Sequence, residues 1–211
     1  MKTKIFLDFD GTLIRSKLMK ESIFEIVSEL GYSKDEVKRI YEEARNQAPF
    51  HPYDFIDSLA KERNVDSEST KEKLARMIDS LSKQCLYDDS ANFLDEIDRK
   101  KYEINLITYG HEEWQRMKVE NTGCRMSFDN LYYVGTKDKW KFVDKFLKKN
   151  EKFIFVDDFA EGVVNMKSSH PNCLAIYMER DDTVADNSIL NHKKDVFRVN
   201  SFDEVMKIIE T

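Results

Sequence analysis

The chain has 211 residues, of which 41% are hydrophobic and 35% charged, and its formal net charge is -6 at pH 7. This size and apolar content suit one packed core with a small accessory module, while the acidic balance disfavours a nucleic-acid-binding surface. Because no apolar run could span a membrane, no signal-peptide pattern follows Met1 and the three cysteines form no metal-like pair, we expect a cytoplasmic protein without membrane or nucleic-acid partners.

The first apolar run is followed at once by two acidic residues. Ile5, Phe6 and Leu7 are typical of a buried parallel strand, and Asp8 and Asp10 come directly after it. Asp is disfavoured in strands, and alternation along an extended chain places these two carboxylates on the same side. Two like charges so close together are costly unless a cation lies between them. Since ligands of open α/β sheets bind beyond the carboxyl ends of the strands, we expect this pair to face a ligand.

Residues 15–86 carry helical patterns and no strand signal. Ser33 with Glu36, and Ser69 with Glu72, have the spacing of a capping box, which predicts a helix start at each pair. We predict about four helices in this block from the recurrence of apolar residues and the helix-start signals. The block is too long for one crossover helix, so we interpret it as an inserted all-α module.

Strands and helices alternate in the rest of the chain. The predicted strands are the apolar runs over 104–107, 131–134, 153–156, 174–177 and 196–199. The predicted helices lie between and around them, over 90–100, 111–121, 139–149, 160–168 and 202–209. This alternation predicts a parallel sheet with helices on both faces. We therefore expect a Rossmann-like, three-layer α/β core over 1–14 and 87–211, with the all-α module over 15–86 inserted in it.

Polar side chains follow three of the predicted strands, and they are Asp8 with Asp10, Thr108, and Asp157 with Asp158. In a parallel sheet these three strand ends meet at one edge. The lysine-rich stretch over 137–141 begins a helix on the same side. Several carboxylates together suit a hard divalent cation. A cation combined with a lysine and a hydroxyl can hold a phosphoryl group and stabilise the charge of its transition state.

These segments resemble the motifs of the haloacid dehalogenase-like superfamily. The sequence DFDGT over 8–12 is similar to motif I (DxDxT), and the strand that ends in Thr108 resembles motif II. A lysine within 137–141 resembles motif III, and the pair at 157–158 resembles the DD form of motif IV. The motifs follow the family's order over nearly the whole chain. The resemblance implies that residues 15–86 are a C1 cap and that the chain is a Mg²⁺-dependent phosphatase acting on a small-molecule phosphomonoester.

The resemblance also implies a role for each matched residue. Asp8 would be the nucleophile that forms an aspartyl-phosphate, and Asp10 would be the general acid and then the base. Thr108 would bind phosphate oxygens, and Lys139 would neutralise the charge of the nucleophile and the phosphoryl group. The other implied phosphate ligands are Gly11, Thr12, Tyr109 and Gly110. The implied Mg²⁺ ligands are the Asp8 carboxylate, the Asp10 carbonyl and Asp158, with Asp157 holding a metal-bound water.

Alternatives remain for the lysine and for the reaction. Lys137 is the second candidate for the motif lysine, and Lys139 is preferred because Phe142 and Val143 follow it at the family's spacing. Asp10 favours phosphoryl transfer, since the family's dehalogenases and phosphonatases generally lack an acid there. A phosphotransferase or mutase on the same scaffold, and a non-catalytic module that binds a phosphorylated ligand, are the alternative functions.

The sequence does not assign a role to the turn over 45–53 or to the histidines. The turn over 45–53 either faces the site or is a surface loop. His111 either contacts the substrate or simply lies near a helix start. His51, His170 and His192 have no spacing typical of metal ligands. The identity of the phosphomonoester is not readable, because cap residues carry no recognisable code.

Overall fold

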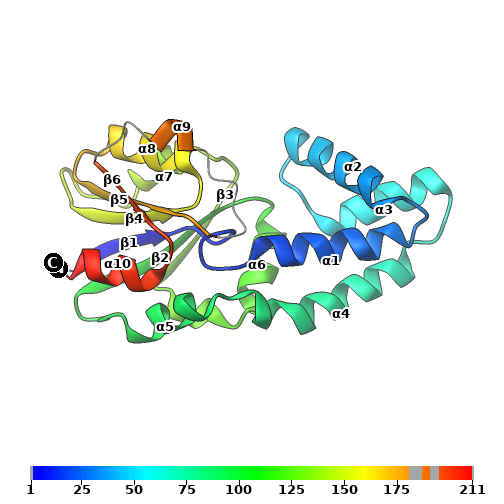
Figure 1. Cartoon of the computed structure of the whole chain (residues 1–211), viewed down its shortest axis with the longest axis horizontal. Helices are drawn as coiled ribbons and strands as arrows, with labels where there is room; N and C mark the ends of the chain where they lie inside the picture. Colours follow the sequence, from blue (N-terminus) through cyan, green and yellow to red (C-terminus); the bar gives the residue numbers. More distant parts are fainter. Residues whose placement is uncertain (1, 181–186, 191–194, 211) are drawn as a thin grey trace.

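A computed structural model describes residues 2–180, 187–190 and 195–210. In this part of the chain, six strands form one parallel sheet with the order β3-β2-β1-β4-β5-β6 (Figure 1). The strands are β1 (Thr3–Leu7), β2 (Tyr102–Tyr109), β3 (Asn130–Val134), β4 (Phe153–Asp157), β5 (Cys173–Met178) and β6 (Val196–Val199). The predicted parallel α/β architecture is therefore confirmed.

Helices cover both faces of the sheet (Figure 1). One face carries α5 (Asp88–Glu96), α6 (Glu112–Asn121) and α10 (Phe202–Ile209), with a short 3-10 helix, η1 (Cys124–Ser127), after α6. The other carries α7 (Lys139–Val143), α8 (Ala160–Ser169) and α9 (Asn187–Leu190). Successive residues of β1 alternate between the two layers: Ile5 and Leu7 belong to one apolar cluster, and Phe6 belongs to the other. The three-layer prediction is thus also confirmed.

The register of the central strands brings their carboxyl ends to the same level. Leu7 of β1 lies beside Leu106 of β2 and Val156 of β4. The central stretches of these strands are mainly apolar because both faces of a parallel sheet are buried, although β2 also carries the buried Asn105. Asp8 follows β1 at the edge where β2 and β4 also end, and Thr108 and Asp157 lie at this edge.

Four of the five helices between β1 and β2 form a module of their own, and they are α1 (Ser16–Ser28), α2 (Lys34–Gln47), α3 (Pro52–Arg63) and α4 (Glu68–Cys85). α1 and α4 run side by side away from the sheet, with α2 and α3 packed against their outer part (Figure 1). The two chain segments that join this helical module to the sheet also lie together. Ile14 forms an antiparallel bridge with Leu86, and the Arg15 N–H donates to the Cys85 carbonyl at 2.7 Å. Within the residues described, no helix combines the length and apolar character that crossing a membrane requires.

One of the two predicted capping boxes is present. Ser33 Oγ accepts a bond from the Glu36 N–H at 3.3 Å, and Glu36 Oε2 accepts one from the Ser33 N–H at 2.7 Å. The box predicted at Ser69 is wrong, because α4 already begins one residue earlier, at Glu68. The preceding Ser67 makes no cap and donates its hydroxyl to Asp57 of α3 instead, at 2.7 Å.

The helix predicted over 139–149 is much shorter than expected and ends at Val143. Beyond it the Phe146 N–H donates to the Val143 carbonyl, three residues back, so the chain tightens into a turn. This turn stacks the ring of Phe146 on Tyr132 of β3, with centroids 4.0 Å apart. The helix therefore ends early, because the turn allows Phe146 to pack against the sheet.

Arg180 joins the end of β5 to the loop that follows β1. Its side chain is 5% exposed, and its Nε and Nη2 donate to the Thr12 carbonyl at 3.1 and 3.0 Å. Its Nη1 donates to the Asp89 carboxylate at 2.8 Å and its Nη2 to Ser90 Oγ at 3.0 Å, both at the start of α5. The guanidinium thus fixes three segments around the edge of the sheet.

We expect Arg180→Met to lower the free energy of unfolding by about 3 kcal/mol, because it leaves a largely buried Asp89 carboxylate without its cation. It also removes two donors from the buried Thr12 carbonyl. Arg198→Met is the matched control: Arg198 pairs with Glu179, and these side chains are 41% and 31% exposed. Its loss should be about 1 kcal/mol or less. Urea denaturation of both variants measures the difference, and equal losses would contradict this role of Arg180.

Candidate functional site

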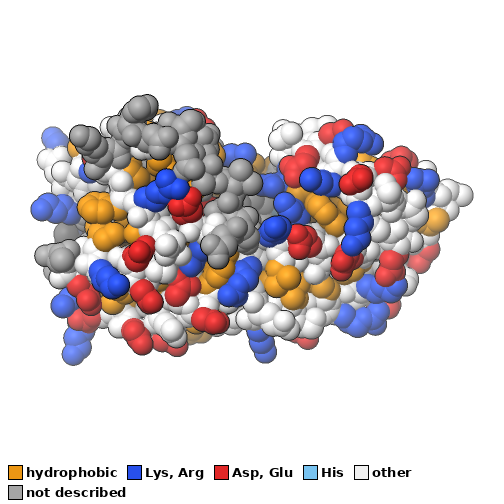
Figure 2. Space-filling view, in the orientation of Figure 1, with side chains coloured by type: hydrophobic (Ala, Val, Ile, Leu, Met, Phe, Trp, Pro, Cys, Tyr) orange, Lys and Arg blue, Asp and Glu red, His pale blue; other side chains and the backbone are white. Residues whose placement is uncertain are grey.

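A cavity of about 700 Å³ lies between the carboxyl edge of the sheet and the helical module. The sheet side of its lining includes Asp8, Asp10, Tyr109, Gly110, Lys139, Asp157 and Asp158. The opposite side comes from α1, α2 and the turn after α2. Arg45 and Asn46 at the end of α2, and Ala48, Pro49 and Phe50 in the turn after it, line the cavity, so this part of the 45–53 segment faces the site. Figure 2 shows Lys and Arg side chains gathered where the two parts of the molecule meet.

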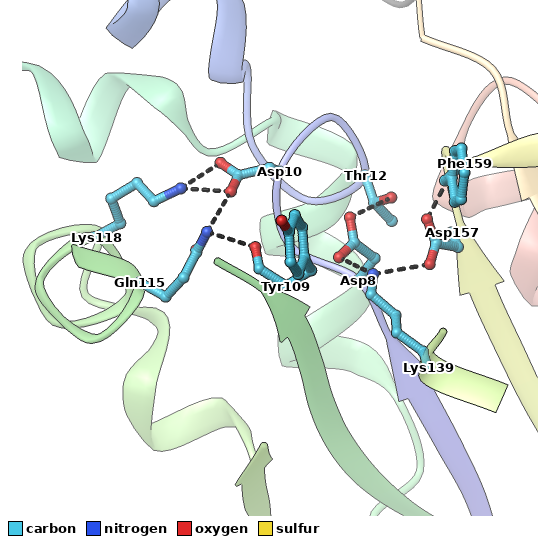
Figure 3. A network of polar contacts seen from close by, with 9 residues as sticks. All are labelled: Asp8, Asp10, Thr12, Tyr109, Gln115, Lys118, Lys139, Asp157 and Phe159. Atoms are coloured by element: carbon cyan, nitrogen blue, oxygen red, sulfur yellow. Dashed lines mark hydrogen bonds and ion pairs between the residues drawn. The ribbon is translucent and has the colours of Figure 1, made fainter. Parts of the chain in front are cut away.

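Asp8 lies at the centre of a buried ion-pair network (Figure 3). Lys139 Nζ contacts Asp8 Oδ1 and donates to Asp157 Oδ2 at 2.8 Å. Thr12 Oγ1 donates to the other Asp8 oxygen at 3.4 Å. Burial alone would lower the pKa of Lys139, but the neighbouring Asp157 and Asp8 raise it above its ordinary value. Lys137, in contrast, places its ammonium 5.8 Å from the Tyr109 ring centroid, so Lys139 is the lysine that reaches Asp8.

Three carboxylates gather beside this lysine. One oxygen from each of Asp8, Asp157 and Asp158 lies within 4.8 Å of the others. Burial raises the pKa of Asp8 to about 7, against the attraction of Lys139, and Asp157 and Asp10 add to the rise. Burial and then the charges of Asp8 and Asp157 raise the pKa of Asp158 well above its ordinary value. A divalent cation would relieve this repulsion, and an all-oxygen donor set fits Mg²⁺.

Asp157 is more constrained than its neighbour in the chain. Besides the contact of its Oδ2 with Lys139, its Oδ1 accepts a bond from the Phe159 N–H at 2.9 Å. Both oxygens are therefore already engaged by groups of the protein. The structure thus gives Asp157 a part in fixing Lys139. Asp158, the next residue, also lines the cavity.

Thr108 lies at the same edge, at the end of β2. Its side chain is buried, and its Oγ1 has no hydrogen-bond partner among the residues that the structure describes. Next to it, Gly110 adopts φ +151, and a Cβ there would lie 2.5 Å from Gln115 Nε2. Only glycine fits this close approach. A buried hydroxyl without a partner is suited to donate a hydrogen bond to an oxygen of a bound anion, although Thr108 itself is not among the residues that line the cavity.

The four residues expected to bind phosphate differ in their position. Tyr109 and Gly110 line the cavity, but the Gly110 N–H already donates to the Val134 carbonyl at 3.3 Å. Gly11 has its N–H bonded to the Ile14 carbonyl at 3.0 Å, and Thr12 is fully buried. Gly11 and Thr12 therefore shape the loop after β1. The Gly11 N–H closes the turn, and the Thr12 hydroxyl donates to Asp8.

Asp10 is held by two residues of α6 that sequence reasoning did not single out. Lys118 Nζ donates to Asp10 Oδ1 at 2.6 Å, and Gln115 Nε2 donates to Asp10 Oδ2 and to the Tyr109 carbonyl, both at 2.9 Å (Figure 3). Burial would raise the pKa of Asp10, but Lys118, Gln115 and Arg45 together outweigh it and hold this pKa below its ordinary value. The signal in the sequence is the lysine four residues after Trp114, on the inward face of a predicted helix.

Residues 4–168 match the family model of haloacid dehalogenase-like hydrolases. The chain belongs to this family. The match covers well over half of the sequence and contains all four motifs, from DFDGT to the acidic pair at 157–158. No curated protein matches the sequence of this haloacid dehalogenase-like hydrolase.

Solved structures show the same fold. A protein described as a haloacid dehalogenase-like hydrolase from Burkholderia xenovorans has TM-score 0.74 and 14% identity, over 98% of this chain and 96% of that one. YfnB from Bacillus subtilis, described as a HAD-hydrolase in a magnesium-bound form, has TM-score 0.65 and 12% identity, over 100% and 99%. L-2-haloacid dehalogenase from Xanthobacter autotrophicus has TM-score 0.63 and 14% identity, over 100% and 99%. At these identities the likeness shows the fold, and the reaction of this hydrolase must be argued from its own site.

Proposed function

We propose that this haloacid dehalogenase-like hydrolase is a Mg²⁺-dependent phosphatase that hydrolyses a small-molecule phosphomonoester through an aspartyl-phosphate. The observation that carries the proposal is Asp10, a second carboxylate on the wall of the cavity that contains Asp8. A halide leaves carbon without a proton, so a dehalogenase has no use for an acid at this position. The oxygen that leaves an alkyl phosphate must be protonated, which gives Asp10 a purpose.

Each step of the proposed reaction uses a residue of the network. A carboxylate oxygen of Asp8 forms a bond to phosphorus while the ester oxygen leaves and takes a proton from Asp10. A water then attacks the aspartyl-phosphate, gives its proton to Asp10 and releases phosphate and the free Asp8 carboxylate. Lys139 stabilises charge on Asp8 and on the transferred group, and Thr108 Oγ1 is available to a phosphoryl oxygen.

Asp8, Asp158 and the Asp10 carbonyl are the proposed Mg²⁺ ligands, with Asp157 beside them. The bound cation supplies charge neutralisation for the phosphoryl oxygens. The support is the cluster of the Asp8, Asp157 and Asp158 carboxylates and the raised pKa of both Asp8 and Asp158, while the Asp10 carbonyl is included because of the family resemblance.

We further propose that residues 15–86 act as a C1 cap on a core of 1–14 and 87–211. α1 and α2 supply the wall of the cavity opposite Asp8, and closure of such a cap would exclude water from the reaction. The cavity lining of this acidic protein carries six cationic side chains against five carboxylates, and the cations are Lys17, Lys20, Arg45, Lys118, Lys137 and Lys139. They suit an anionic substrate. Because the cysteines are free and buried, we place the protein in a reducing compartment, the cytoplasm.

Phosphate release from a panel of phosphomonoesters, with Mg²⁺ and then with excess EDTA, tests the proposal. We expect release from at least one ester in Mg²⁺, and its loss by on the order of 10³-fold in EDTA, because the cation neutralises the phosphoryl charge. Addition of Mg²⁺ after EDTA should restore the rate. Halide release from 2-haloacids would favour a dehalogenase instead.

The same panel separates the two alternative functions. Isomerised sugar phosphate without free phosphate would indicate a mutase or another phosphotransferase. Tight binding of a phosphorylated compound by a folded protein that turns over no ester would indicate a non-catalytic binding module.

A further inference from the structure

Two histidines from distant parts of the sequence meet where the helical module contacts the core. His51 precedes α3 and His111 precedes α6. Their ring centroids are 4.5 Å apart, with the planes inclined by 45°. The side chain of His51 is only 10% exposed. Neither residue lines the cavity of the candidate active site. No metal-ligand spacing surrounds His51 in the sequence, because the residue beside it, His111, is brought there by the fold.

The nitrogens of these rings are buried without hydrogen bonds. Both His51 nitrogens and His111 Nδ1 have no hydrogen-bond partner among the described residues. Two carboxylates lie within ion-pair distance of His51 but make no hydrogen bond to it: Asp54 Oδ2 is 3.5 Å from His51 Nδ1, and Glu113 Oε2 is 4.0 Å from His51 Nε2. Buried polar atoms are normally paired, so three such nitrogens in one place need an explanation.

We propose that His51, His111 and Glu113 form a binding site for a transition-metal cation of the Zn²⁺ type. One ligand atom from each of the three lies within 4.8 Å of the other two. Imidazole nitrogens combined with a carboxylate oxygen are a donor set that Zn²⁺ and its neighbours in the first transition row accept. Mg²⁺ and Ca²⁺ prefer oxygen donors, so this site and the cluster around Asp8 select different cations.

The geometry allows the site to close around an ion. Zn²⁺ holds its nitrogen and oxygen ligands at about 2.0–2.2 Å, so the three groups must approach one another by about 1 Å. The side chain of Glu113 is 71% exposed and free to swing inward. Asp54, whose side chain is 79% exposed, stands beside the other ring nitrogen of His51, where it can accept the Nδ1 hydrogen and orient the ring, while water takes the remaining position on the ion.

Such a cation would connect the two parts of the molecule. His51 belongs to the helical module and follows Pro49 and Phe50, which line the cavity. His111 and Glu113 belong to the core and stand at the start of α6, which also carries Gln115 and its bond to Asp10. An ion shared between them restrains the module relative to the sheet. The inference rests on these contacts alone and does not depend on the proposed phosphatase activity.

Titration of the full chain with Co²⁺, a visible-absorbing substitute for Zn²⁺, tests the site. Excess Mg²⁺ is present throughout to occupy the acidic cluster. We expect an absorption band that saturates at one equivalent of Co²⁺ and is abolished by Zn²⁺. His51→Ala and His111→Ala should each weaken Co²⁺ binding by at least about 100-fold, because loss of even an outer-shell partner costs about 10- to 100-fold.

His170→Ala is the matched control, because His170 Nε2 already contacts Asp144 at 2.8 Å on the other side of the core. This variant should bind Co²⁺ as the wild type does. His51→Gln provides a second test if His51→Ala loses its near-ultraviolet circular dichroism, since glutamine is bulkier and polar. Wild-type protein that shows no Co²⁺ band in Mg²⁺ would overturn the proposal, as would a band that survives in folded His51 and His111 variants.

Discussion

Asp8→Asn is expected to lower kcat by a factor on the order of 10⁴ or more on whichever phosphomonoester the enzyme hydrolyses best. The amide has nearly the same shape as the carboxylate but cannot attack phosphorus. Its oxygen can still accept the bond from Thr12 Oγ1, so the loop after β1 keeps its support. The loss should therefore appear in kcat, measured by phosphate release in saturating Mg²⁺, while the circular dichroism of the variant matches the wild type.

Asp138→Asn is the matched control for this experiment. Asp138 precedes Lys139, but its carboxylate pairs with Lys141 on the exposed side of α7, at 2.5 Å. The same chemical change should leave kcat nearly unaffected there. Hydrolysis at the wild-type rate by a folded Asp8→Asn variant would show that another group attacks phosphorus, and the aspartyl-phosphate mechanism would be wrong.

The sheet and the floor of the site could be predicted because their signals are local. A parallel strand buried on both faces must be a continuous apolar run, and the polar residue that ends it is visible in the sequence. β1 and β4 meet this condition in their central residues and β2 meets it apart from the buried Asn105, and their register brings Asp8, Asp157 and the end of β2 together. The choice of Lys139 over Lys137 rested on the apolar residues that follow, and the structure places Lys139 at Asp8.

Contacts between distant segments could not be predicted in the same way. The spacing from Trp114 places Lys118 on the inward face of its helix, but only the fold shows that its partner is Asp10. His51 and His111 lie in separate segments, and only the packing of the helical module on the core brings their rings together. The end of α7 was missed for a similar reason, since the stacking of Phe146 on Tyr132 depends on the neighbouring strand.

The surroundings of Asp10 make its role the sharpest part of the mechanism to test. Lys118 and Gln115 hold this side chain as a carboxylate. That form is ready to accept the proton of the attacking water in the second step. In the first step the same group must deliver a proton to the leaving oxygen, and the need for this proton depends on the ester. An alkoxide requires it, whereas p-nitrophenolate is stable enough to leave without it.

We therefore expect Asp10→Asn to lower kcat on alkyl phosphates by about 10²- to 10⁴-fold. With p-nitrophenyl phosphate the variant should release a burst of one equivalent of p-nitrophenol and then slow down, because the aspartyl-phosphate forms without the acid but lacks the base that activates water. Rapid mixing with absorbance detection measures the burst. Glu43→Gln, a change at an acid outside the cavity lining whose carboxylate pairs with the exposed Arg39, should retain wild-type kinetics. An equal loss on both esters without a burst would contradict the acid–base role, since it would mean that Asp10 serves only to shape the site.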